Sequence, residues 1–461
     1  MTLIQSISGI RGTIGGKVGA NLTPMDIVRF TAAFGTWLKN KNIATPKVVI
    51  GRDARISGQM LSHLVSATLQ GLGIDVVDLG LATTPTVEIA VPEENAIGGI
   101  ILTASHNPMQ WNALKLLNSC GEFISAEEGE EVLEIARKGD FEFADVKHLG
   151  KYSQNDSYLQ KHIDKILALP LVDVEAIQQR RFRIAVDAVN SVGGIAVPAL
   201  LKALGVLQIT EFNCEPTGHF AHNPEPLPEN LVQFSKEVER GNFDLGIVVD
   251  PDVDRLAFIC ENGEPFGEEY TLVAVADYVL KHQKGSTVSN LSSTQALKIV
   301  TQKHGQTHFF SAVGEVNVVN VMKQTKAVIG GEGNGGVIYP ALHYGRDALV
   351  GIALFLSHLA KFGKSASILR ATYPKFYMSK NKIELADNIN IDDILEKMQR
   401  KYAKFDLCTI DGLKVNFDSA WVHLRKSNTE PIIRIYAEAD TQQTADNLTE
   451  KVILDIRELS K

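Results

Sequence analysis

Three aspartates, Asp250, Asp252 and Asp254, stand at alternate positions of the sequence. Carboxylates this close together repel one another unless a cation lies among them, and hard oxygen ligands suit Mg²⁺ or Ca²⁺. An EF-hand loop would need glycine at its sixth position, where this chain has Arg255, and residues 256–259 are typical of a strand. The segment therefore predicts a Mg²⁺ site with coordination positions left open for substrate oxygens, and a solvated acidic turn is the alternative.

A serine that could act as a nucleophile, Ser105, follows the apolar run 97–102. Free serine is a poor nucleophile and needs a base or another source of activation. Lys115, shortly after it, could serve as a general acid or base if its pKa is lowered. The segment 103–108 also contains Asn and Pro, so a turn with a purely conformational role is the alternative.

A glycine-rich segment, 330–336, formally contains the pattern G-x-G-x-x-G. A dinucleotide site would need a helix directly after this pattern, but the apolar segment 337–340 follows, and this glycine-rich segment does not end in the Lys-Ser or Lys-Thr of a P-loop. The segment instead presents Glu332 and Asn334 on flexible backbone, which suits the hydroxyls of a sugar. A hairpin loop is the alternative.

Two guanidiniums, those of Arg425 and Arg434, flank a segment that carries hydroxyls at Ser427 and Thr429. Together with the amides of a turn, these groups would form a cradle for a phosphate dianion. An exposed polar hairpin is the alternative.

These residues need elements that bring them together, and the apolar periodicity predicts which ones. Strands are expected at 47–50, 74–79, 97–102, 183–187, 245–249, 287–291 and 327–329, with apolar-striped helices between them. Strands that alternate with helices indicate mostly parallel sheets covered by helices. After about residue 372 the pattern changes to alternating strands and a final helix, which indicates a smaller α+β domain.

We therefore predict an α/β fold with three consecutive α/β domains, whose sheets are mixed and mostly parallel, and a C-terminal α+β domain around a central cleft. The expected domains are 1–150, 151–256, 257–372 and 373–461. In each α/β domain a polar or glycine-rich cluster directly follows an apolar strand. Ligands of open α/β sheets bind beyond the carboxyl ends of the strands, so we expect the three loops to meet at one site.

The composition limits the function classes. Of the 461 residues, 44% are apolar and 22% charged, which is typical of folded globular proteins. A net charge of -8 without a Lys/Arg block argues against a nucleic-acid partner but allows a small anionic substrate. The four cysteines form no C-x-x-C pair, which disfavours a zinc site or a disulfide framework. We expect no membrane partner and a cytoplasmic location, because no stretch approaches the about 20 apolar residues of a membrane span.

In this order and at these separations, the four clusters resemble the α-D-phosphohexomutase superfamily, which comprises phosphoglucomutases, phosphomannomutases and phosphoglucosamine mutases. The resemblance covers essentially the whole chain, with further matches at 8–12, 51–58 and 222–229. It implies an isomerase that interconverts hexose 6-phosphate and hexose 1-phosphate. A phosphoserine enzyme and a bound hexose 1,6-bisphosphate would be the intermediates.

The resemblance also implies roles for individual residues. Ser105 would carry the phosphoryl group and would hold Mg²⁺ together with Asp250, Asp252 and Asp254, while Lys115 would be the acid or base. Arg11 and Arg255 would brace the phosphate being transferred. The residues that would bind the substrate are His106, Glu332, Asn334, Arg425, Ser427, Asn428, Thr429 and Arg434.

The chain departs from the common pattern in two loops. Many members have Ser at the position of Asn334 and His at that of Gly336, so a direct imidazole contact is missing here. The metal motif carries Pro251 and Val253 where many members have Gly, and both changes leave the carboxylates intact.

The preferred sugar is less strongly indicated. Glu430 and the pair 103–104 resemble the glucosamine branch, whereas Asn428 resembles the glucose and mannose branch. We expect conversion of glucosamine 6-phosphate to glucosamine 1-phosphate, with a phosphoglucomutase or phosphomannomutase as the alternative. The rival functions are a Mg²⁺-dependent sugar phosphatase and a non-catalytic Ca²⁺- or sugar-phosphate-binding protein.

Overall fold

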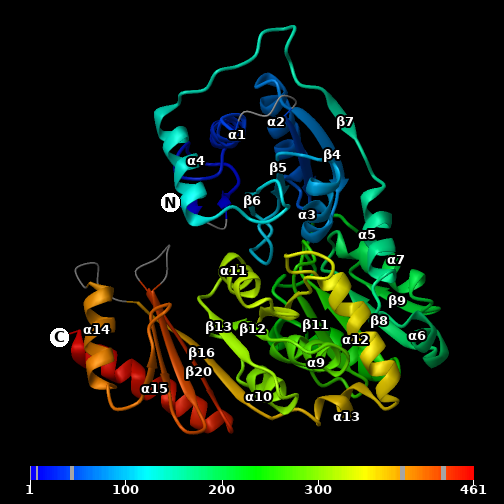
Figure 1. Ribbon diagram of the computed structural model, residues 1–461, viewed down its shortest axis with the longest axis vertical. Coiled ribbons are helices and arrows are strands. Elements are labelled where there is room, and N and C mark those ends of the chain that lie inside the picture. Colours follow the sequence, from blue (N-terminus) through cyan, green and yellow to red (C-terminus); the bar gives the residue numbers. More distant parts are fainter. Residues whose placement is uncertain (1, 7–8, 42–45, 385–389, 427–431, 461) are drawn as a thin grey trace.

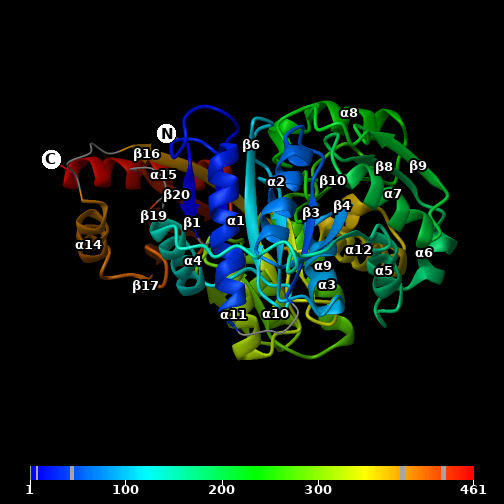
Figure 2. The same ribbon diagram turned by 90° about the horizontal axis from the view of Figure 1, so that it is seen from above.

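The computed structural model describes residues 2–6, 9–41, 46–384, 390–426 and 432–460. Within these residues the chain forms four sheets, each with its own helices, which we call units 1 to 4 in chain order (Figure 1). In two perpendicular views, unit 4 extends to one side of the other three (Figures 1 and 2). Among the described residues, every helix is too short or too polar to span a lipid bilayer.

Unit 1 is a long mixed sheet with helices on both faces. Its elements are β1 (Ile4–Ser6), β2 (Gly9–Thr13), α1 (Pro24–Lys39), β3 (Lys47–Arg52), α2 (Gly58–Gly71), β4 (Asp75–Leu81), α3 (Thr84–Glu93), β5 (Gly98–Leu102), β6 (Trp111–Leu117), α4 (Ala126–Lys138) and β7 (Tyr152–Gln154), with strand order β1-β2-β6-β5-β3-β4-β7. Val48 and Ile50 pack with α1, α2 and α4, whereas Val49 packs with α3. Both faces of β3 are therefore buried, which explains the apolar run at 48–50 in its middle.

Unit 2 is a smaller mixed sheet that shares one of its two cores with unit 3. Its elements are α5 (Tyr158–Leu167), α6 (Val174–Arg180), β8 (Arg183–Asp187), α7 (Gly193–Ala203), β9 (Gln208–Phe212), the 3-10 helix η1 (Pro228–Asn230), α8 (Val232–Arg240), β10 (Leu245–Val249) and β11 (Leu256–Cys260), with strand order β11-β10-β8-β9. Val248 packs with α8 on one face. Ile247 and Val249 belong to the core that continues into unit 3.

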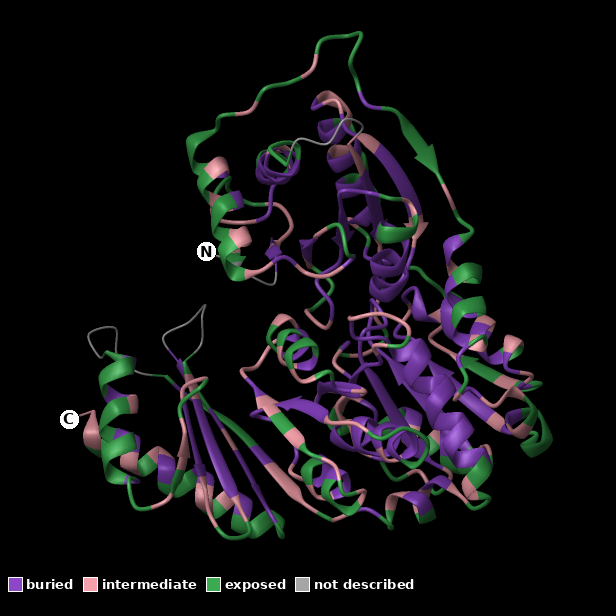
Figure 3. Cartoon of the chain, in the orientation of Figure 1, coloured by how far each residue is buried: buried purple, intermediate pink, exposed green. Residues whose placement is uncertain are grey.

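Unit 3 contains the most deeply buried helix of the described chain. Its elements are α9 (Glu268–His282), β12 (Thr287–Asn290), α10 (Ala296–Lys303), β13 (His308–Ser311), α11 (Glu315–Thr325), β14 (Ile329–Glu332), β15 (Gly336–Ile338), α12 (Ala348–Phe362) and α13 (Ala366–Arg370), with strand order β13-β12-β14-β15. Most residues of α12 are buried, because this helix packs in the core shared by units 2 and 3 (Figure 3). Asp347 caps the helix by accepting hydrogen bonds from the backbone N–H groups of Leu349 and Val350.

Unit 4 is an antiparallel sheet with two helices on one face. Its elements are β16 (Tyr377–Glu384), α14 (Ile391–Lys401), β17 (Asp406–Cys408), β18 (Leu413–Asn416), β19 (Trp421–Lys426), β20 (Ile432–Ala439) and α15 (Gln442–Leu459), with strand order β16-β20-β19-β18-β17. Val422 and Leu424 face the helices, as their alternation predicts. The intervening His423 lies 2.9 Å from the hydroxyl of Ser292, so the other face contacts unit 3.

The strand pairing confirms the predicted fold class of three mixed, mostly parallel sheets followed by an α+β unit. Over units 1 to 3 of the described chain together, seven strand pairs are parallel and five antiparallel, with three of each kind in unit 1. β7 pairs with β4 of unit 1, and β11 pairs with β10 of unit 2. The domain boundaries at 150, 256 and 372 and the central cleft stay predictions.

Candidate active site

Ser105 lies directly after β5, on a tightly turned loop that aims its hydroxyl at the aspartates of unit 2. Its side chain is buried, and Oγ donates a hydrogen bond to Oδ2 of Asp250 at 2.7 Å. The backbone of Ser105 is in the left-handed region, with φ at 47°, which is uncommon for a non-glycine residue. A hydrogen bond from its N–H to Oγ1 of Thr103 (3.0 Å) supports this conformation.

One buried arginine, Arg55, holds the whole Ser105 loop. Its Nε donates to Oδ2 of Asp53 at 3.0 Å, and this carboxylate also accepts a hydrogen bond from Thr103. The other guanidinium nitrogens donate to the backbone carbonyls of Ser105 (2.5 Å), Asn107 (2.7 Å), Pro108 (2.8 Å) and Trp111 (2.9 Å). The segment around Arg55 matches the family, but the sequence does not indicate this role, because the four carbonyl partners of Arg55 lie about 50 positions further along the chain.

The three aspartates form a compact, buried cluster at the carboxyl end of β10. One carboxylate oxygen from each of Asp250, Asp252 and Asp254 lies within 4.8 Å of the others. Two of their oxygens, Oδ1 of Asp252 and Oδ1 of Asp254, are buried without a hydrogen-bond partner in the described part of the chain. Burial and the two neighbouring carboxylates raise the pKa of Asp250 well above its ordinary value. Unpartnered oxygens and mutual repulsion fit a hard divalent cation.

The backbone of this acidic loop is strained at one position. Val253 has φ at 65°, which is a genuine outlier for a β-branched residue. Two hydrogen bonds fix this conformation. The N–H of Val253 donates to the carbonyl of Asp250 (3.1 Å), and the carbonyl of Val253 accepts from the N–H of Ala348 (3.1 Å). Oδ1 of Asp250 also accepts from the N–H groups of Asp254 and Arg255, which closes the loop around its first carboxylate.

Lys115 lies on β6 and its ammonium group reaches the same aspartates. Nζ donates to Oδ2 of Asp252 at 2.7 Å and to Oδ2 of Asp254 at 3.3 Å. Burial opposes its charge, but these two carboxylates outweigh burial and raise the pKa of Lys115 above its ordinary value. The condition that its pKa be lowered is therefore not met in this arrangement, in which Lys115 is a charged proton donor.

Arg11 and Arg255 bring two positive charges to the site. Burial and the charge of Arg255 lower the pKa of Arg11, and the Nε atoms of both guanidiniums are buried without a partner among the described residues. Arg255 also donates to Oε1 of Glu225 at 3.0 Å. Burial and the charge of Arg255 hold the pKa of His106 well below its ordinary value, so this ring is neutral near pH 7. Cations with free N–H groups suit a phosphoryl group between them.

The glycine-rich segment forms a hairpin that presents Glu332 at the end of β14. Strand β14 extends through Glu332, whereas the sequence predicted that it ends at residue 329. Glycines 330 and 331 are buried in this strand, and neighbouring atoms leave no room for a Cβ on either of them. Oε1 of Glu332 accepts hydrogen bonds from Asn290 (2.7 Å) and the N–H of Gly314 (3.0 Å), and Oε2 accepts one from Arg346 (2.8 Å). Oδ1 of Asn334 accepts from the N–H of Gly336 at 3.2 Å. The segment is thus a hairpin, as the alternative predicts, and the binding of a sugar by Glu332 and Asn334 stays a prediction.

In unit 4, the structure describes Arg425 and Arg434, whereas Ser427, Asn428 and Thr429 lie outside the described residues. The two arginines face each other across strands β19 and β20. Like charges directly opposite each other in a sheet are destabilising, so this pair suits an anion. Nε of Arg425 donates to Oδ2 of Asp411 (2.7 Å), which also accepts from the N–H of Val313 (2.9 Å) in unit 3.

Two further residues that the sequence interpretation missed touch the aspartates. Thr84, at the start of α3, donates from Oγ1 to Oδ2 of Asp252 at 2.6 Å. Arg346 donates to Oδ2 of Asp254 at 2.6 Å. No local motif marks either residue, since each acts on a residue more than 90 positions away in the sequence.

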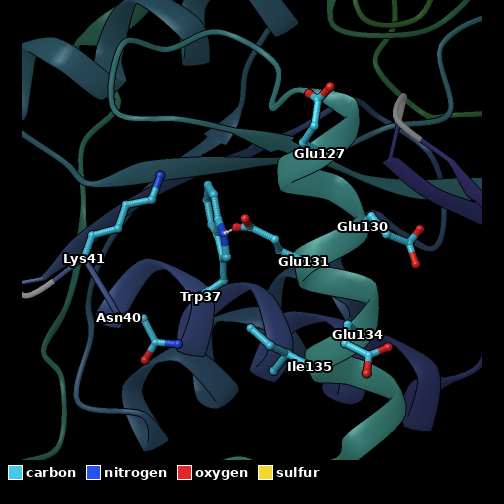
Figure 4. Close-up of a pocket in the computed structure, with 8 residues that line it drawn as sticks. All are labelled: Trp37, Asn40, Lys41, Glu127, Glu130, Glu131, Glu134 and Ile135. Carbon is cyan, nitrogen blue, oxygen red and sulfur yellow. Dashed lines mark hydrogen bonds between the residues drawn. The ribbon is translucent and has the colours of Figure 1, made fainter.

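A pocket of about 760 Å³ lies away from this site, between α1 and α4 (Figure 4). There Nε1 of Trp37 donates to Oε2 of Glu131 at 2.7 Å, and the ammonium of Lys41 lies 3.7 Å from the centre of the Trp37 ring. These groups satisfy one another, and the residues that line the pocket include none of the predicted site residues. We therefore attribute it to the packing of the two helices.

Comparison with known proteins covers the chain from end to end. Family models for phosphoglucomutase/phosphomannomutase, alpha/beta/alpha domains I, II and III and the C-terminal domain, match residues 3–143, 160–263, 267–376 and 382–454. A phosphoglucomutase/phosphomannomutase of Thermococcus kodakarensis is 37% identical, over 98% of this chain and 99% of that protein. A probable phosphoglucosamine mutase of Methanopyrus kandleri is 32% identical, over 98% of this chain and 97% of that protein.

A solved structure agrees with this result. The crystal structure of a phosphoglucomutase/phosphomannomutase family protein from Burkholderia thailandensis has a TM-score of 0.84 to this chain, at 26% sequence identity. The match covers 99% of this chain and 98% of the other.

Proposed function

Since the chain belongs to the phosphoglucomutase/phosphomannomutase family and is therefore a phosphohexomutase, an isomerase, we propose that it works through a phosphoserine at Ser105 and a bound hexose 1,6-bisphosphate. The observation that carries this proposal is the hydrogen bond of 2.7 Å from Oγ of Ser105 to Asp250. A serine loop from unit 1 and an acidic loop from unit 2 meet there. A phosphoryl group on Ser105 would therefore lie beside the aspartates.

The site residues have separate parts in this proposal. Asp250, Asp252 and Asp254 would hold Mg²⁺ together with an oxygen of the phosphoserine, consistent with their unpartnered oxygens. When bound, Mg²⁺ would neutralise charge on the phosphoryl oxygens. Arg11 would brace the phosphoryl group from the side of unit 1.

The proposed phosphoryl transfer breaks one bond and forms one, and it moves two protons. The bond between Oγ of Ser105 and phosphorus breaks while a sugar hydroxyl forms a bond to phosphorus; Oγ gains a proton and the hydroxyl loses one. Lys115, as a charged donor, is our candidate for giving the proton to Oγ and, once neutral, for accepting the proton that the hydroxyl loses. The sugar then turns end for end, and the second phosphoryl group returns to Ser105. Arg255 would brace the transferred group, and Arg425 and Arg434 would hold the phosphate at the far end of the sugar.

For the sugar, we propose glucosamine 6-phosphate as the preferred substrate. The relative from Methanopyrus kandleri is named a probable phosphoglucosamine mutase, whereas that from Thermococcus kodakarensis is named a phosphoglucomutase/phosphomannomutase. Burial opposes ionisation of Glu332, but Arg346 and its other donors outweigh it and lower its pKa, so it stays an acceptor for a hydroxyl or an ammonium group. The cytoplasmic location and the small-molecule sugar-phosphate partner stay predictions.

Replacing Ser105 by alanine tests the phosphoserine. We expect Ser105→Ala to abolish turnover while hexose phosphate still binds, and to remove a mass increment of about 80 Da, one phosphoryl group, from the intact protein. Ser66→Ala is the matched control, because Ser66 is a buried serine of the same unit whose hydroxyl has no partner in the described chain. Near-normal activity of Ser105→Ala would end the assignment.

The substrate is tested by competition. Glucosamine, glucose and mannose 6-phosphates are offered together, and their kcat/KM values are compared. We expect glucosamine 6-phosphate to have the highest value. Release of inorganic phosphate without an isomeric sugar phosphate would instead favour a phosphatase.

A further inference from the structure

Arg346 connects the carboxylates of three segments at the edge of the site. The residue is buried, with 9% of its surface exposed, and lies between the hairpin β14–β15 and helix α12. Its Nε donates to Glu315 (3.0 Å), one terminal nitrogen to Oε2 of Glu332 (2.8 Å) and the other to Oδ2 of Asp254 (2.6 Å). A single guanidinium thus joins the carboxylate of Glu332 to Asp254, the third aspartate of the acidic loop that we call the metal loop, residues 250–255.

The path of this side chain depends on a glycine in the facing strand. A Cβ built on Gly336 would overlap Cδ of Arg346 and would lie 3.1 Å from its Cγ and 3.1 Å from Oδ1 of Asn334. The backbone of Gly336 does not itself require glycine, because its φ lies outside the left-handed region. The stem of Arg346 cannot move aside freely, since its guanidinium is fixed by three carboxylates. Glycine at 336 therefore provides the space through which Arg346 reaches Asp254.

We propose that Arg346 is the positioning residue that fixes Glu332 relative to the metal loop, and that Gly336 is small to accommodate it. The proposal rests on the proposed function, in which Glu332 reads the sugar. It assigns a role to a position where the common family histidine is absent. An imidazole at 336 and the arginine at 346 would compete for the same space.

The hydrogen bonds of Glu332 show what this fixation leaves for the substrate. A carboxylate has about four acceptor positions. Three are occupied in the described chain, by Asn290, the N–H of Gly314 and Arg346. Glu332 therefore has room for about one donor from the sugar, in a direction set by the other three. Displacing Arg346 would leave a second acceptor position of Glu332 open and would no longer fix the orientation of its carboxylate. The site would then discriminate less among hexoses.

A double-mutant cycle between Arg346→Lys and Glu332→Gln tests the coupling. Lysine keeps the charge, so the buried carboxylates are not left without a cation, but its single nitrogen cannot hold all three in the same geometry. Binding of glucosamine, glucose and mannose 6-phosphates is measured by calorimetry, and turnover is measured in parallel. We expect each single variant to lose about tenfold in affinity and to discriminate less among the sugars, and the double variant to lose no more than the weaker-binding single. KM should rise by more than kcat falls.

The matched control for the arginine is Arg370→Lys. Arg370 lies in the same unit, donates to the carbonyl of Phe266 and stacks on Tyr270, outside the site. It should bind the three sugars like the wild type. Two results would overturn the proposal. One is a double variant in which the affinity losses of Arg346→Lys and Glu332→Gln multiply. The other is an affinity of Arg346→Lys within twofold of that of the wild type.

A second variant avoids changing any charge. Gly336→Ala should reproduce the loss of affinity and discrimination, because its methyl group displaces the stem of Arg346. Gly129→Ala is the control, since a Cβ at that helical position meets no other atom within 4 Å. Equal behaviour of the two alanine variants would contradict the assigned role of Gly336.

The same data separate this proposal from the function on which it rests. A wild type that binds hexose phosphates without isomerising them would refute the mutase, while the binding cycle would still decide the role of Arg346. Failure to bind any of the three sugars would overturn both.

Discussion

Replacing Arg55 by lysine tests whether one buried guanidinium holds the Ser105 loop in place. The Arg55 side chain donates five hydrogen bonds, one to Asp53 and four to backbone carbonyls between residues 105 and 111. An ammonium group has three donors, so at least two of the five acceptors lose their partner. A hydrogen bond to a charged group contributes about 1.5 kcal/mol or more, and two such losses amount to about 3 kcal/mol. If this free energy normally holds Ser105 in its reactive position, its loss lowers turnover about a hundredfold.

The assay measures three quantities on the same preparations: kcat/KM, the fraction of protein that carries a phosphoryl group, and the melting temperature. Arg52→Lys is the control, because Arg52 lies three positions away and its side chain donates, within the described residues, one longer hydrogen bond of 3.3 Å to the carbonyl of Asp53. We expect Arg55→Lys to lose activity and phosphorylation together, whereas Arg52→Lys retains both. Activity of Arg55→Lys within threefold of the control would refute the idea that this guanidinium positions the nucleophile.

Three further predictions concern pH, metal and the fourth unit. Burial raises the pKa of Glu269 to about 8. This group therefore stabilises the fold fully below its ordinary pKa near 4.5, and its stabilisation is lost as the pH rises through 8. Melting curves from pH 5 to 9 should show this loss of stability, and Glu269→Gln should reduce it. Added Mg²⁺ should raise the melting temperature of the wild type by mass action, and an equal rise in Asp252→Asn would contradict the metal site. Asp411→Asn should raise KM about fivefold with little change in kcat, because the carboxylate that ties Arg425 to Val313 loses its charge; an unchanged KM would show that this tie does not position the phosphate anchor.

The central strands of units 1 and 2 were predictable because β3, β5, β8 and β10 each contain an apolar run followed by polar residues. Residues 48–50 of β3 and all of β10 are apolar, and both strands are buried on two faces. The polar strands β7 and β9 were not predicted, because their sequences carry no such run. The prediction was wrong at the end of β14, where strand continues through two glycines. Glycine normally weakens a strand, so a propensity argument ends the strand before it. Here Met322 packs where a side chain of Gly330 would lie, which only the folded neighbourhood reveals.

The candidate site was predictable only where its chemistry is local in the sequence. The aspartates are separated by two positions each, so their mutual repulsion, and with it the hypothesis of a cation site, follows from the spacing. Arg55 and Arg346 act across long separations, on Ser105 and Asp254. The segment around Arg55 matches the family, but the local sequence indicates neither the role of Arg55 nor that of Arg346. The structure alone shows that Gly336 occupies a strand position whose backbone does not require glycine, and that the side chain of Arg346 fills the space beside it.

The shared charges explain why these distant residues matter to the chemistry. Asp254 accepts hydrogen bonds from Lys115 of unit 1 and Arg346 of unit 3, and Arg346 in turn holds Glu332. Each cation therefore links its own unit to the acidic loop of unit 2, and removing one leaves a buried carboxylate short of a partner in another unit. The loops that would hold the metal and the sugar are thus fixed by one network of ion pairs, to which unit 1 contributes Lys115. A change in the sugar loop should consequently be felt at the metal, and the Mg²⁺ dependence of activity should shift in Arg346→Lys although the aspartates themselves are unchanged.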